Sequence, residues 1–235
     1  MAHIPHLLLA GPWIADEIAL PRQKAHHLER VLRLDPGSEV TYTDGRGTVG
    51  AGRFRPASVL RGSESKLEAP PVSLTLAVAP PHERDRVRFL VEKLAELEVS
   101  RLLWLQTRFG AGRPPESARA AAWAIAALEQ SRGAWLMEVD PKWVGPGALR
   151  AGAFFADLGG DDLPPEGAGE MVVAIGPEGG WAAGEIPDGA RRLGLGRTVL
   201  RVETAAVASA VLCRFGKRAN PGCDPATLRG SLPPG

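Results

Sequence analysis

The sequence predicts an α/β fold, in which a mostly parallel sheet follows a small β-rich module. From Val72 onward, short apolar runs alternate with segments whose apolar residues recur every three or four positions, as in strands and helices of a parallel sheet. Before Pro70, the chain shows short alternating strands and turns instead. We therefore expect one unit at residues 1–69, a second at 70–219 and a Pro/Gly-rich tail at 220–235.

In the first unit, residues 38–43 alternate between polar and apolar side chains, and Asp44-Gly45 follows directly. This pattern predicts a strand and a hairpin turn, with residues 48–54 as the returning strand. Upstream, the apolar residues of 23–34 fit one face of a helix, which should end at Asp35-Pro36-Gly37.

The second unit is expected to contain alternating strands and helices, with helices on both faces of the sheet. Apolar runs predict its strands, and residues three and four apart on one face predict its helices. The strands fall at 72–79, 102–105, 153–156, 171–175 and 198–200, and the helices at 83–98, 116–131, 184–193 and 203–215.

The net charge of +1 argues against a protein that holds nucleic acid by its overall charge, but it leaves room for a local basic face. The basic residues are 23 Arg and only 5 Lys. Arginine suits bidentate contact with phosphate, whereas a GC-rich genome or adaptation to heat would produce the same preference.

Other classes of protein are excluded by simple patterns. No apolar run reaches the length of about 18 residues that spans a bilayer, and residues 1–12 do not resemble a signal peptide. Cys213 and Cys223 form no disulfide framework, and Cys213 lies in an apolar stretch where a small buried side chain is expected. With five scattered His, no metal site is expected. We expect a cytoplasmic protein without a membrane anchor.

The loop after the strand at 171–175 reads Gly176-Pro-Glu-Gly-Gly-Trp181. Loops at the carboxyl ends of parallel strands bind ligands, and glycines let the backbone approach a ligand closely. Glu178 would meet a cation or a polar ligand edge there. A plain strand-to-helix turn with a solvated Glu178 is the alternative.

A second candidate loop runs from Leu193-Gly-Leu-Gly-Arg197 to Glu203. It lacks the third glycine of a dinucleotide fingerprint, and the chain has no phosphate-binding P-loop motif. Glu203 and Thr204 suit the start of the last helix. Arg201 stands two residues earlier, either as a site residue or as an exposed ion-pair partner of Glu203.

A third group, Glu129-Gln-Ser-Arg132, ends the predicted helix at 116–131. These side chains either point into a cleft or form a solvated helix end, where Arg132 interacts with the helix dipole. A Ser-His-Asp triad is not recognisable in the sequence.

These motifs, taken together, resemble the RsmE family, methyltransferases of the SPOUT class that act on N3 of a uridine in 16S ribosomal RNA. The resemblance covers roughly residues 25–216. It is carried by Ile175-Gly-Pro-Glu-Gly-Gly180 with Glu185, by Leu195-Gly-Arg-Thr-Val-Leu-Arg-Val-Glu-Thr-Ala205, by His27-Leu-Glu-Arg-Val-Leu-Arg33, by Lys93 with Glu96-Leu97, and by Glu129-Gln-Ser131. The chain departs from the family where Glu98 replaces a helix-ending Gly and where Arg132 comes one position early.

The resemblance implies a PUA-like β-barrel at 1–69 for RNA binding, and a SPOUT-type sheet at 70–219 with a deep C-terminal trefoil knot. It also implies a homodimer and S-adenosylmethionine (SAM) as the cofactor. The cofactor-binding residues carried over are Ile175, Gly176, Pro177, Glu178, Gly179, Leu195, Gly196, Val199, Leu200, Arg201, Thr204 and Ala205.

The resemblance also suggests roles in catalysis and in RNA binding. Arg201 would stabilise charge on a uracil oxygen, while Glu178 or Glu203 would act as a base or orient Arg201. Arg22, Arg30, Arg33, Arg108 and Arg132 would hold RNA, as would Arg53 and Arg55. The alternatives are a SPOUT enzyme that methylates the ribose 2′-oxygen, a non-catalytic RNA-binding protein and, more distantly, a nicotinamide-dependent enzyme.

Overall fold

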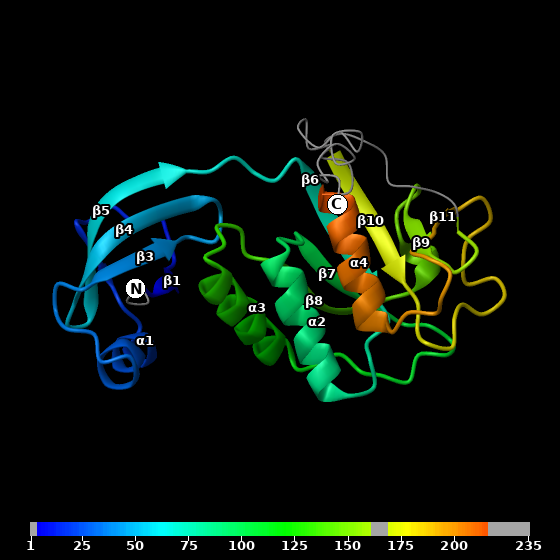
Figure 1. Cartoon of the computed structure of the whole chain (residues 1–235), viewed down its shortest axis with the longest axis horizontal. Coiled ribbons are helices and arrows are strands. Elements are labelled where there is room, and N and C mark those ends of the chain that lie inside the picture. Colours follow the sequence, from blue (N-terminus) through cyan, green and yellow to red (C-terminus); the bar gives the residue numbers. More distant parts are fainter. Residues whose placement is uncertain (1–3, 161–168, 216–235) are drawn as a thin grey trace, which may run out of the picture.

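The structure is a computed structural model that describes residues 4–160 and 169–215. It contains two separate sheets, which form the two lobes of Figure 1. The strands of the smaller sheet lie within residues 6–66, and those of the larger one lie within residues 72–193. The expected boundary at 69/70 thus falls in the connection between the sheets, while the expected tail at 220–235 and Cys223 lie outside the described residues.

The smaller sheet has five strands in the order β1-β3-β4-β5-β2 and curls around its own core (Figure 1). The expected hairpin at Asp44-Gly45 is confirmed, because β3 and β4 pair antiparallel across it. The expected helix at 23–34 is shorter and continues as one π-helical turn. The elements are β1 (His6–Leu8), β2 (Glu17–Ala19), α1 (Arg22–His26), η1 (His27–Val31), β3 (Glu39–Thr43), β4 (Thr48–Arg55) and β5 (Ser58–Lys66).

The larger sheet has six parallel strands in the order β11-β9-β10-β6-β7-β8. Because β7 and β10 lie on opposite sides of β6, the strand order reverses there, and ligands of open α/β sheets bind near such a point. The elements are β6 (Val72–Val78), α2 (Arg84–Glu96), β7 (Arg101–Leu105), α3 (Ser117–Ser131), β8 (Glu138–Val144), η2 (Pro146–Ala148), β9 (Phe154–Ala156), β10 (Gly169–Ile175), β11 (Arg191–Leu193) and α4 (Val202–Phe215).

The expectation of helices on both faces of this sheet is wrong for the described residues. Helices α2, α3 and α4 lie side by side on one face, and all three contribute to a single core cluster (Figure 1). The opposite face carries a smaller cluster around Phe155, against which the loop residues Leu149, Trp181 and Ile186 pack. Turns and loops therefore replace the second helical layer.

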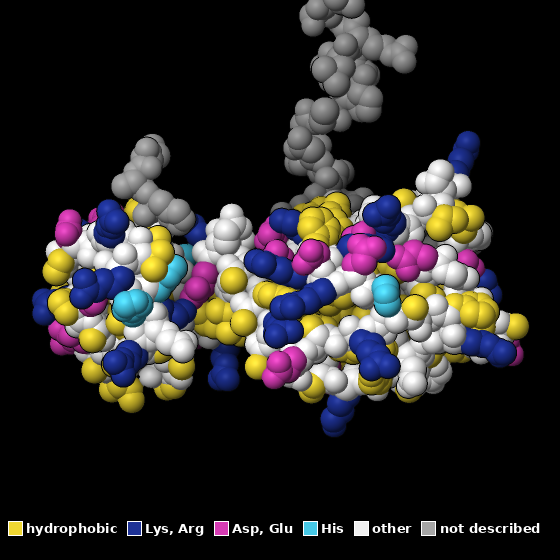
Figure 2. All heavy atoms as spheres, turned by 90° about the horizontal axis from the view of Figure 1, so that it is seen from below, with side chains coloured by type: hydrophobic (Ala, Val, Ile, Leu, Met, Phe, Trp, Pro, Cys, Tyr) yellow, Lys and Arg dark blue, Asp and Glu magenta, His cyan; other side chains and the backbone are white. Residues whose placement is uncertain are grey.

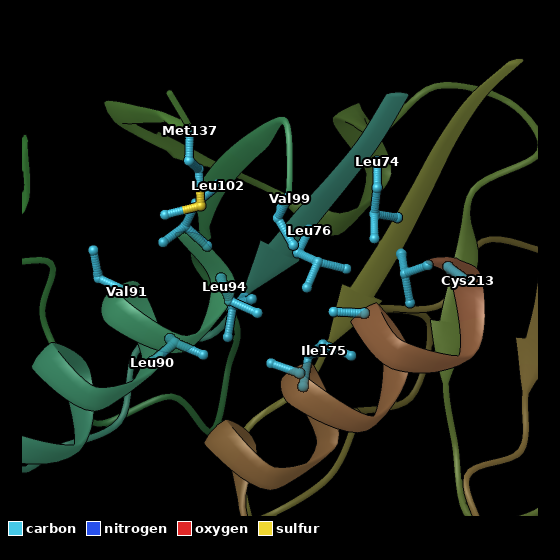
Figure 3. Close-up of a cluster of buried hydrophobic side chains, with 14 of the residues drawn as sticks. Leu74, Leu76, Leu90, Val91, Leu94, Val99, Leu102, Met137, Ile175 and Cys213 are labelled. Carbon is cyan, nitrogen blue, oxygen red and sulfur yellow. The ribbon is translucent and has the colours of Figure 1, made fainter. Parts of the chain in front are cut away.

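Figure 3 shows the main core, which contains Leu74 and Leu76 of β6 together with Leu90 and Leu94 of α2, with Leu74 lying toward Cys213 of α4. All four leucine side chains are fully buried, which stabilises the fold by about 2 kcal/mol for each of them before conformational entropy is counted. Cys213 lies in the same cluster, as expected, and burial raises the pKa of its thiol to about 11.

Two expected elements take a different form in the structure. Residues 184–193 form turns and then the short strand β11 in place of a helix, because Gly184 and Gly189 adopt positive φ angles of 77° and 73° and Pro187 interrupts the segment. Residues 198–200 form no strand. The segment 184–193 lies between the two loops that line the cavity described below, and residues 198–200 belong to the second of these loops.

The lobes meet through residues 129–136, which we call the docking segment. The Leu8 amide donates a hydrogen bond of 2.8 Å to Glu129, and Lys24 forms an ion pair with the same carboxylate. The Gly47 amide donates to the Ala134 carbonyl at 2.9 Å. Glu129 is therefore a contact between the lobes, rather than part of a cleft or a solvated helix end.

Candidate functional site

A cavity of about 290 Å³ lies at the carboxyl edge of the larger sheet, and we call it the glycine-loop cavity. The loops that follow β9, β10 and β11 form its walls, which places it beside the point where the strand order reverses. Its lining residues are Ala156, Asp157, Leu158, Ile175, Gly176, Pro177, Glu178, Gly179, Gly180, Trp181, Leu195, Gly196, Thr198, Val199, Leu200, Val202 and Ala205.

The position of Trp181 explains why the loop after β10, which forms one wall of the cavity, needs glycine at residue 176. Its indole nitrogen donates a hydrogen bond of 2.9 Å to the Ala156 carbonyl, and its ring packs edge-on against Phe155. A Cβ atom at Gly176 would lie 2.9 Å from the Trp181 ring, closer than real contacts allow. The backbone at Gly176 can therefore pass under the indole only without a side chain.

Glu185 does not line the cavity but stabilises the same loop through hydrogen bonds. One carboxylate oxygen accepts a hydrogen bond of 2.8 Å from the Ala182 amide, and the other accepts one of 2.5 Å from the Arg108 amide. Since Arg108 follows β7, this side chain joins two loops at the carboxyl edge of the sheet.

The charged centre of the site is an arginine, Arg86, that the sequence analysis did not single out. Its Nε and Nη2 atoms donate to the two carboxylate oxygens of Glu203 at 2.9 and 2.6 Å, which is the bidentate geometry of a strong ion pair. Nη2 also donates to Glu178 at 2.5 Å. Arg86 thus joins α2 to the start of α4 and to a cavity loop.

Glu203 is 8% exposed as a residue, and burial alone would raise the pKa of its carboxyl. The hydrogen bonds and positive charge of Arg86 outweigh burial, and the pKa of Glu203 lies below its ordinary value of 4.5. A carboxylate held in this way is a weak base. The geometry fits positioning better than proton removal for Glu203.

Ten of the twelve expected cofactor-binding residues line the cavity, whereas Arg201 and Thr204 do not. The residues that line it are Ile175, Gly176, Pro177, Glu178, Gly179, Leu195, Gly196, Val199, Leu200 and Ala205. Asp157 and Leu158 also line the cavity, although no motif in the sequence indicated them. The strand predicted at 153–156 could have indicated both residues, because the loop after a parallel strand lies at the carboxyl edge of the sheet, where the cavity is.

Arg201 directly precedes α4, and its carbonyl accepts the Ala205 amide at 2.8 Å. Its guanidinium is exposed and forms no side-chain hydrogen bond or ion pair with another described residue. Its positive charge contributes to lowering the pKa of Glu203, but Arg86, rather than Arg201, is the bonded partner of Glu203. Neither Glu178 nor Glu203 orients Arg201 through a hydrogen bond.

The five residues expected to bind RNA lie in three places. Arg22, Arg30 and Arg33 are exposed on the segment of α1 and η1 in the smaller lobe. Arg108 is exposed on the loop after β7. Arg132 ends α3 with a left-handed backbone, and its guanidinium donates to the Ile4 carbonyl at 2.9 Å, so it takes part in the contact between the lobes.

Arg53 and Arg55 form ion pairs with Glu39 and Glu17 on the smaller sheet. Among the described residues, no three His, Cys, Asp or Glu side chains are grouped as a metal site would need. None of the helices in the described ranges has the length and apolar character to cross a membrane.

An open parallel sheet with glycine-rich loops around a cavity at its carboxyl edge is the architecture of α/β proteins that bind ligands at this edge. Comparison with known protein families shows to which family within this class the chain belongs. The model of the RNA methyltransferase domain matches residues 68–214, more than half of the chain. The chain belongs to this family, and its resemblance to RsmE proteins is confirmed.

The chain is 28% identical to the ribosomal RNA small subunit methyltransferase E of Synechocystis, over 82% of its own length and 71% of the relative's. It also resembles the crystal structure of a ribosomal RNA small subunit methyltransferase E from Neisseria gonorrhoeae bound to SAM, at 26% identity and a TM-score of 0.77, with 89% and 96% of the two chains covered. A SAM-bound structure from Legionella pneumophila, at 20% identity, a TM-score of 0.78 and 91% and 98% coverage, has the same fold.

Proposed function

We propose that this protein transfers a methyl group from SAM to N3 of a uridine in 16S ribosomal RNA. The observation that carries the proposal is the position of the glycine-loop cavity. Its walls are made by the loops that the RsmE resemblance assigns to the cofactor, and they lie within the residues that the family model matches. The names of the relatives from Synechocystis and Neisseria gonorrhoeae support the reaction and the substrate.

The cavity residues suit SAM in both shape and chemistry. Leu195, Leu200 and Ala205 supply an apolar wall for a flat base, and the loop of Gly176–Gly180 offers backbone groups without side chains. Gly196 has a φ angle of 136°, which other residues rarely adopt. The bound cofactor supplies an electrophilic methyl group on a positively charged sulfur.

Uridine N3 carries a proton, and the neutral nitrogen is a poor nucleophile, so the transfer requires loss of that proton or stabilisation of the resulting anion. We assign the second role to Arg201, because its guanidinium is exposed beside the cavity wall and pairs with no carboxylate of residues 4–160 and 169–215. Glu178 lines the cavity and is held by Arg86. Glu178 therefore either orients the reacting groups or accepts the proton.

The proposal extends to the assembly. The C-terminal loops form a deep trefoil knot, the smaller lobe is a PUA-like barrel, and two copies of the chain form the working enzyme in the cytoplasm. The curled five-stranded sheet and the six-stranded parallel sheet support this architecture, and membership of the family supports the rest. Arg22, Arg30, Arg33, Arg108 and Arg132 hold the RNA in this proposal.

The test is single-turnover methylation of a 16S RNA fragment or small subunit, followed by nucleoside analysis. We expect 3-methyluridine from the wild-type protein. We expect Arg201→Ala to lower the rate by about 100-fold, the usual loss when one donor to a developing negative charge is removed. Glu178→Gln should lower it by at least tenfold, and calorimetry should show that Arg201→Ala binds SAM normally.

Arg197→Ala, which removes a nearby exposed arginine outside the cavity lining, is the matched control. Methyl on the ribose 2′-oxygen would replace the N3 assignment by the alternative SPOUT specificity. No SAM binding at high micromolar concentration would favour a non-catalytic RNA-binding protein. Wild-type rates in both site variants would contradict the residue roles.

A further inference from the structure

A second cavity, of about 360 Å³, lies where α2 and α3 begin, and we call it the basic cavity. The segment before α2, the start of α2 and the loop that leads into α3 form its walls. Its lining residues are His82, Arg84, Val87, Ala111, Arg113, Pro114, Pro115, Glu116 and Arg119. Neither the proposed cofactor site nor the proposed RNA-binding arginines include any of them.

Three arginines and a histidine line this cavity, against the single carboxylate of Glu116. All four basic residues are exposed, and Figure 2 shows Lys and Arg side chains gathered on this side of the larger lobe. None of the four side chains forms a hydrogen bond or ion pair with another residue in the described ranges. By contrast, Arg88, one turn further along α2, pairs with Glu92.

The positive ends of two helices add to this charge. Glu83 and Glu116 occupy the N-cap positions of α2 and α3 without making a capping hydrogen bond, and Asp85 is the acidic residue in the first turn of α2, whereas the first turn of α3 has none. Cations near a helix N-terminus are unfavourable, yet Arg84 begins α2 and Arg119 lies in the first turn of α3. The arrangement is favourable once an anion lies between them, because backbone amides and arginines would then donate to it together.

The wall of the basic cavity is also well fixed. Pro114-Pro115 restricts the backbone ahead of α3. The loop before it packs tightly, since a Cβ atom at Gly112 would lie 2.0 Å from the Pro80 carbonyl oxygen. A wall held in this way limits the conformational cost of binding to the arginine side chains, because the backbone that carries Arg113 is already fixed.

The basic cavity and the glycine-loop cavity have neighbouring walls. Arg84 lines the first, and Arg86, about 3 Å further along the helix axis, binds Glu178 of the second. From the other side, Phe109 packs against Gly179, where a Cβ atom would lie 3.2 Å from that of Phe109. Two short segments, 84–86 and 109–111, therefore connect the walls of the two cavities.

We propose that the basic cavity binds a backbone phosphodiester of the substrate RNA next to the target nucleotide. The proposal rests on the proposed function for the identity of that RNA. Arg84, Arg113 and Arg119 donate to the phosphate oxygens and fix the position of the strand, while the glycine-loop cavity receives the base. Contacts of this kind position a nucleic acid and raise affinity without reading its sequence.

The experiment measures the affinity of the full-length protein for a 16S RNA fragment at several salt concentrations. We expect the double variant Arg113→Gln/Arg119→Gln to bind about tenfold more weakly, with the slope of log affinity against log salt reduced by about 0.7, the value for one lost phosphate contact on a single strand. Its affinity for SAM, measured by calorimetry, should equal that of the wild type. At saturating RNA, kcat should be unchanged while KM rises.

Arg113→Lys/Arg119→Lys keeps both charges, and because Lys also binds phosphate as a point charge, this variant should retain affinity within about threefold. Arg88→Gln, on the same helix but outside the cavity, is the control and should bind RNA as the wild type does. Unchanged affinity and slope in the Gln double variant, or equal loss in the Lys variant, would overturn the proposal. A wild-type protein that binds RNA in an Arg113-dependent manner but transfers no methyl would instead contradict the proposed function alone.

Discussion

Arg86 makes three hydrogen bonds, two to the carboxylate of Glu203 and one to that of Glu178. Glu203 lies in a position that is nearly closed to water. Without the guanidinium, Glu203 would keep its negative charge in a buried place with only the weaker effect of the Arg201 charge to offset it. Removing one partner of such a pair is costly because the other is left uncompensated.

We therefore expect Arg86→Gln to lower the free energy of unfolding by about 2 kcal/mol at pH 7. The pKa of Glu203 is lowered in the folded state, so its contribution is present above about pH 4.5 and is lost as the pH falls through the folded pKa. The difference between variant and wild type should shrink below pH 4.5. Urea unfolding from pH 7 to about pH 3 measures both effects, because the window extends below pH 4.5.

Arg88→Gln is the control for this experiment, because Arg88 forms an exposed pair with Glu92 on the same helix. Its loss should change stability by no more than about 0.5 kcal/mol. Equal destabilisation by the two substitutions would show that Arg86 does not hold Glu203.

The sequence revealed the carboxylates of the site but not the arginine that holds them. Glu178 and Glu203 stand in recognisable motifs, whereas Arg86 lies on the polar side of a helix that was predicted only from its apolar residues. Its partners lie 92 and 117 residues further along the chain. Only the folded sheet brings α2, the Gly176 loop and α4 together.

Among the elements, the loop between β7 and α3 connects the two cavities. Arg108 binds Glu185 through its amide, Phe109 packs on Gly179, and Gly112 lies against Pro80 and Pro81. Gly112 is the position with the least space, because its Cβ would meet two carbonyl oxygens at 2.0 and 2.4 Å.

We expect Gly112→Ala to destabilise the protein by about 1–3 kcal/mol, since backbone atoms must move to make room. The displaced loop should also weaken RNA binding. Gly147→Ala is the matched control, because nothing lies within 4 Å of a Cβ atom there. Thermal unfolding of both variants gives the comparison, and equal melting temperatures would contradict the tight packing at Gly112.

The long helices and buried strands were predictable from apolar spacing alone, as α2, α3, β6 and β10 show. The segments around the cavity were harder. Residues 184–193 contain enough apolar and charged residues for a helix, but two positive-φ glycines and Pro187 favour turns. Residues 198–200 are apolar like a strand, yet they line the cavity instead of pairing with a neighbour.

At the scale of the whole molecule, the docking segment connects the lobes away from the connection at 67–71. Trp135 packs directly on the backbone of Gly47, where a Cβ atom would lie 2.3 Å from the ring. The ammonium of Lys66 lies 5.6 Å from the centre of the same indole. These contacts fix the smaller sheet against α3.

We expect Trp135→Ala to increase the radius of gyration measured by small-angle scattering, because the lobes lose their main packing contact. Stability should fall by about 2 kcal/mol, less than for a fully buried Trp, since Trp135 is half-buried. Trp143→Ala removes an exposed indole from β8 and serves as the control. An unchanged radius in Trp135→Ala would show that other contacts hold the lobes.

The net charge of +1 described the molecule as a whole and excluded binding by bulk charge. A net charge does not show which arginines are paired with carboxylates and which are not. Glu17, Glu39, Glu92 and Glu203 neutralise arginines within the fold, whereas the arginines of the basic cavity have no such partner in the described ranges. Composition cannot distinguish these two groups, since the difference depends on tertiary contacts.

The ion-pair cluster of Arg86 also has a consequence for the thermodynamics of ligand binding. It joins helix α2, a cavity loop and the start of α4 before any ligand is present. The free energy of ordering this wall therefore belongs to folding rather than to association, and less of a ligand's interaction energy is lost when it binds. A protein built in this way is preorganised, and mutations that loosen Arg86 should weaken binding chiefly through entropy.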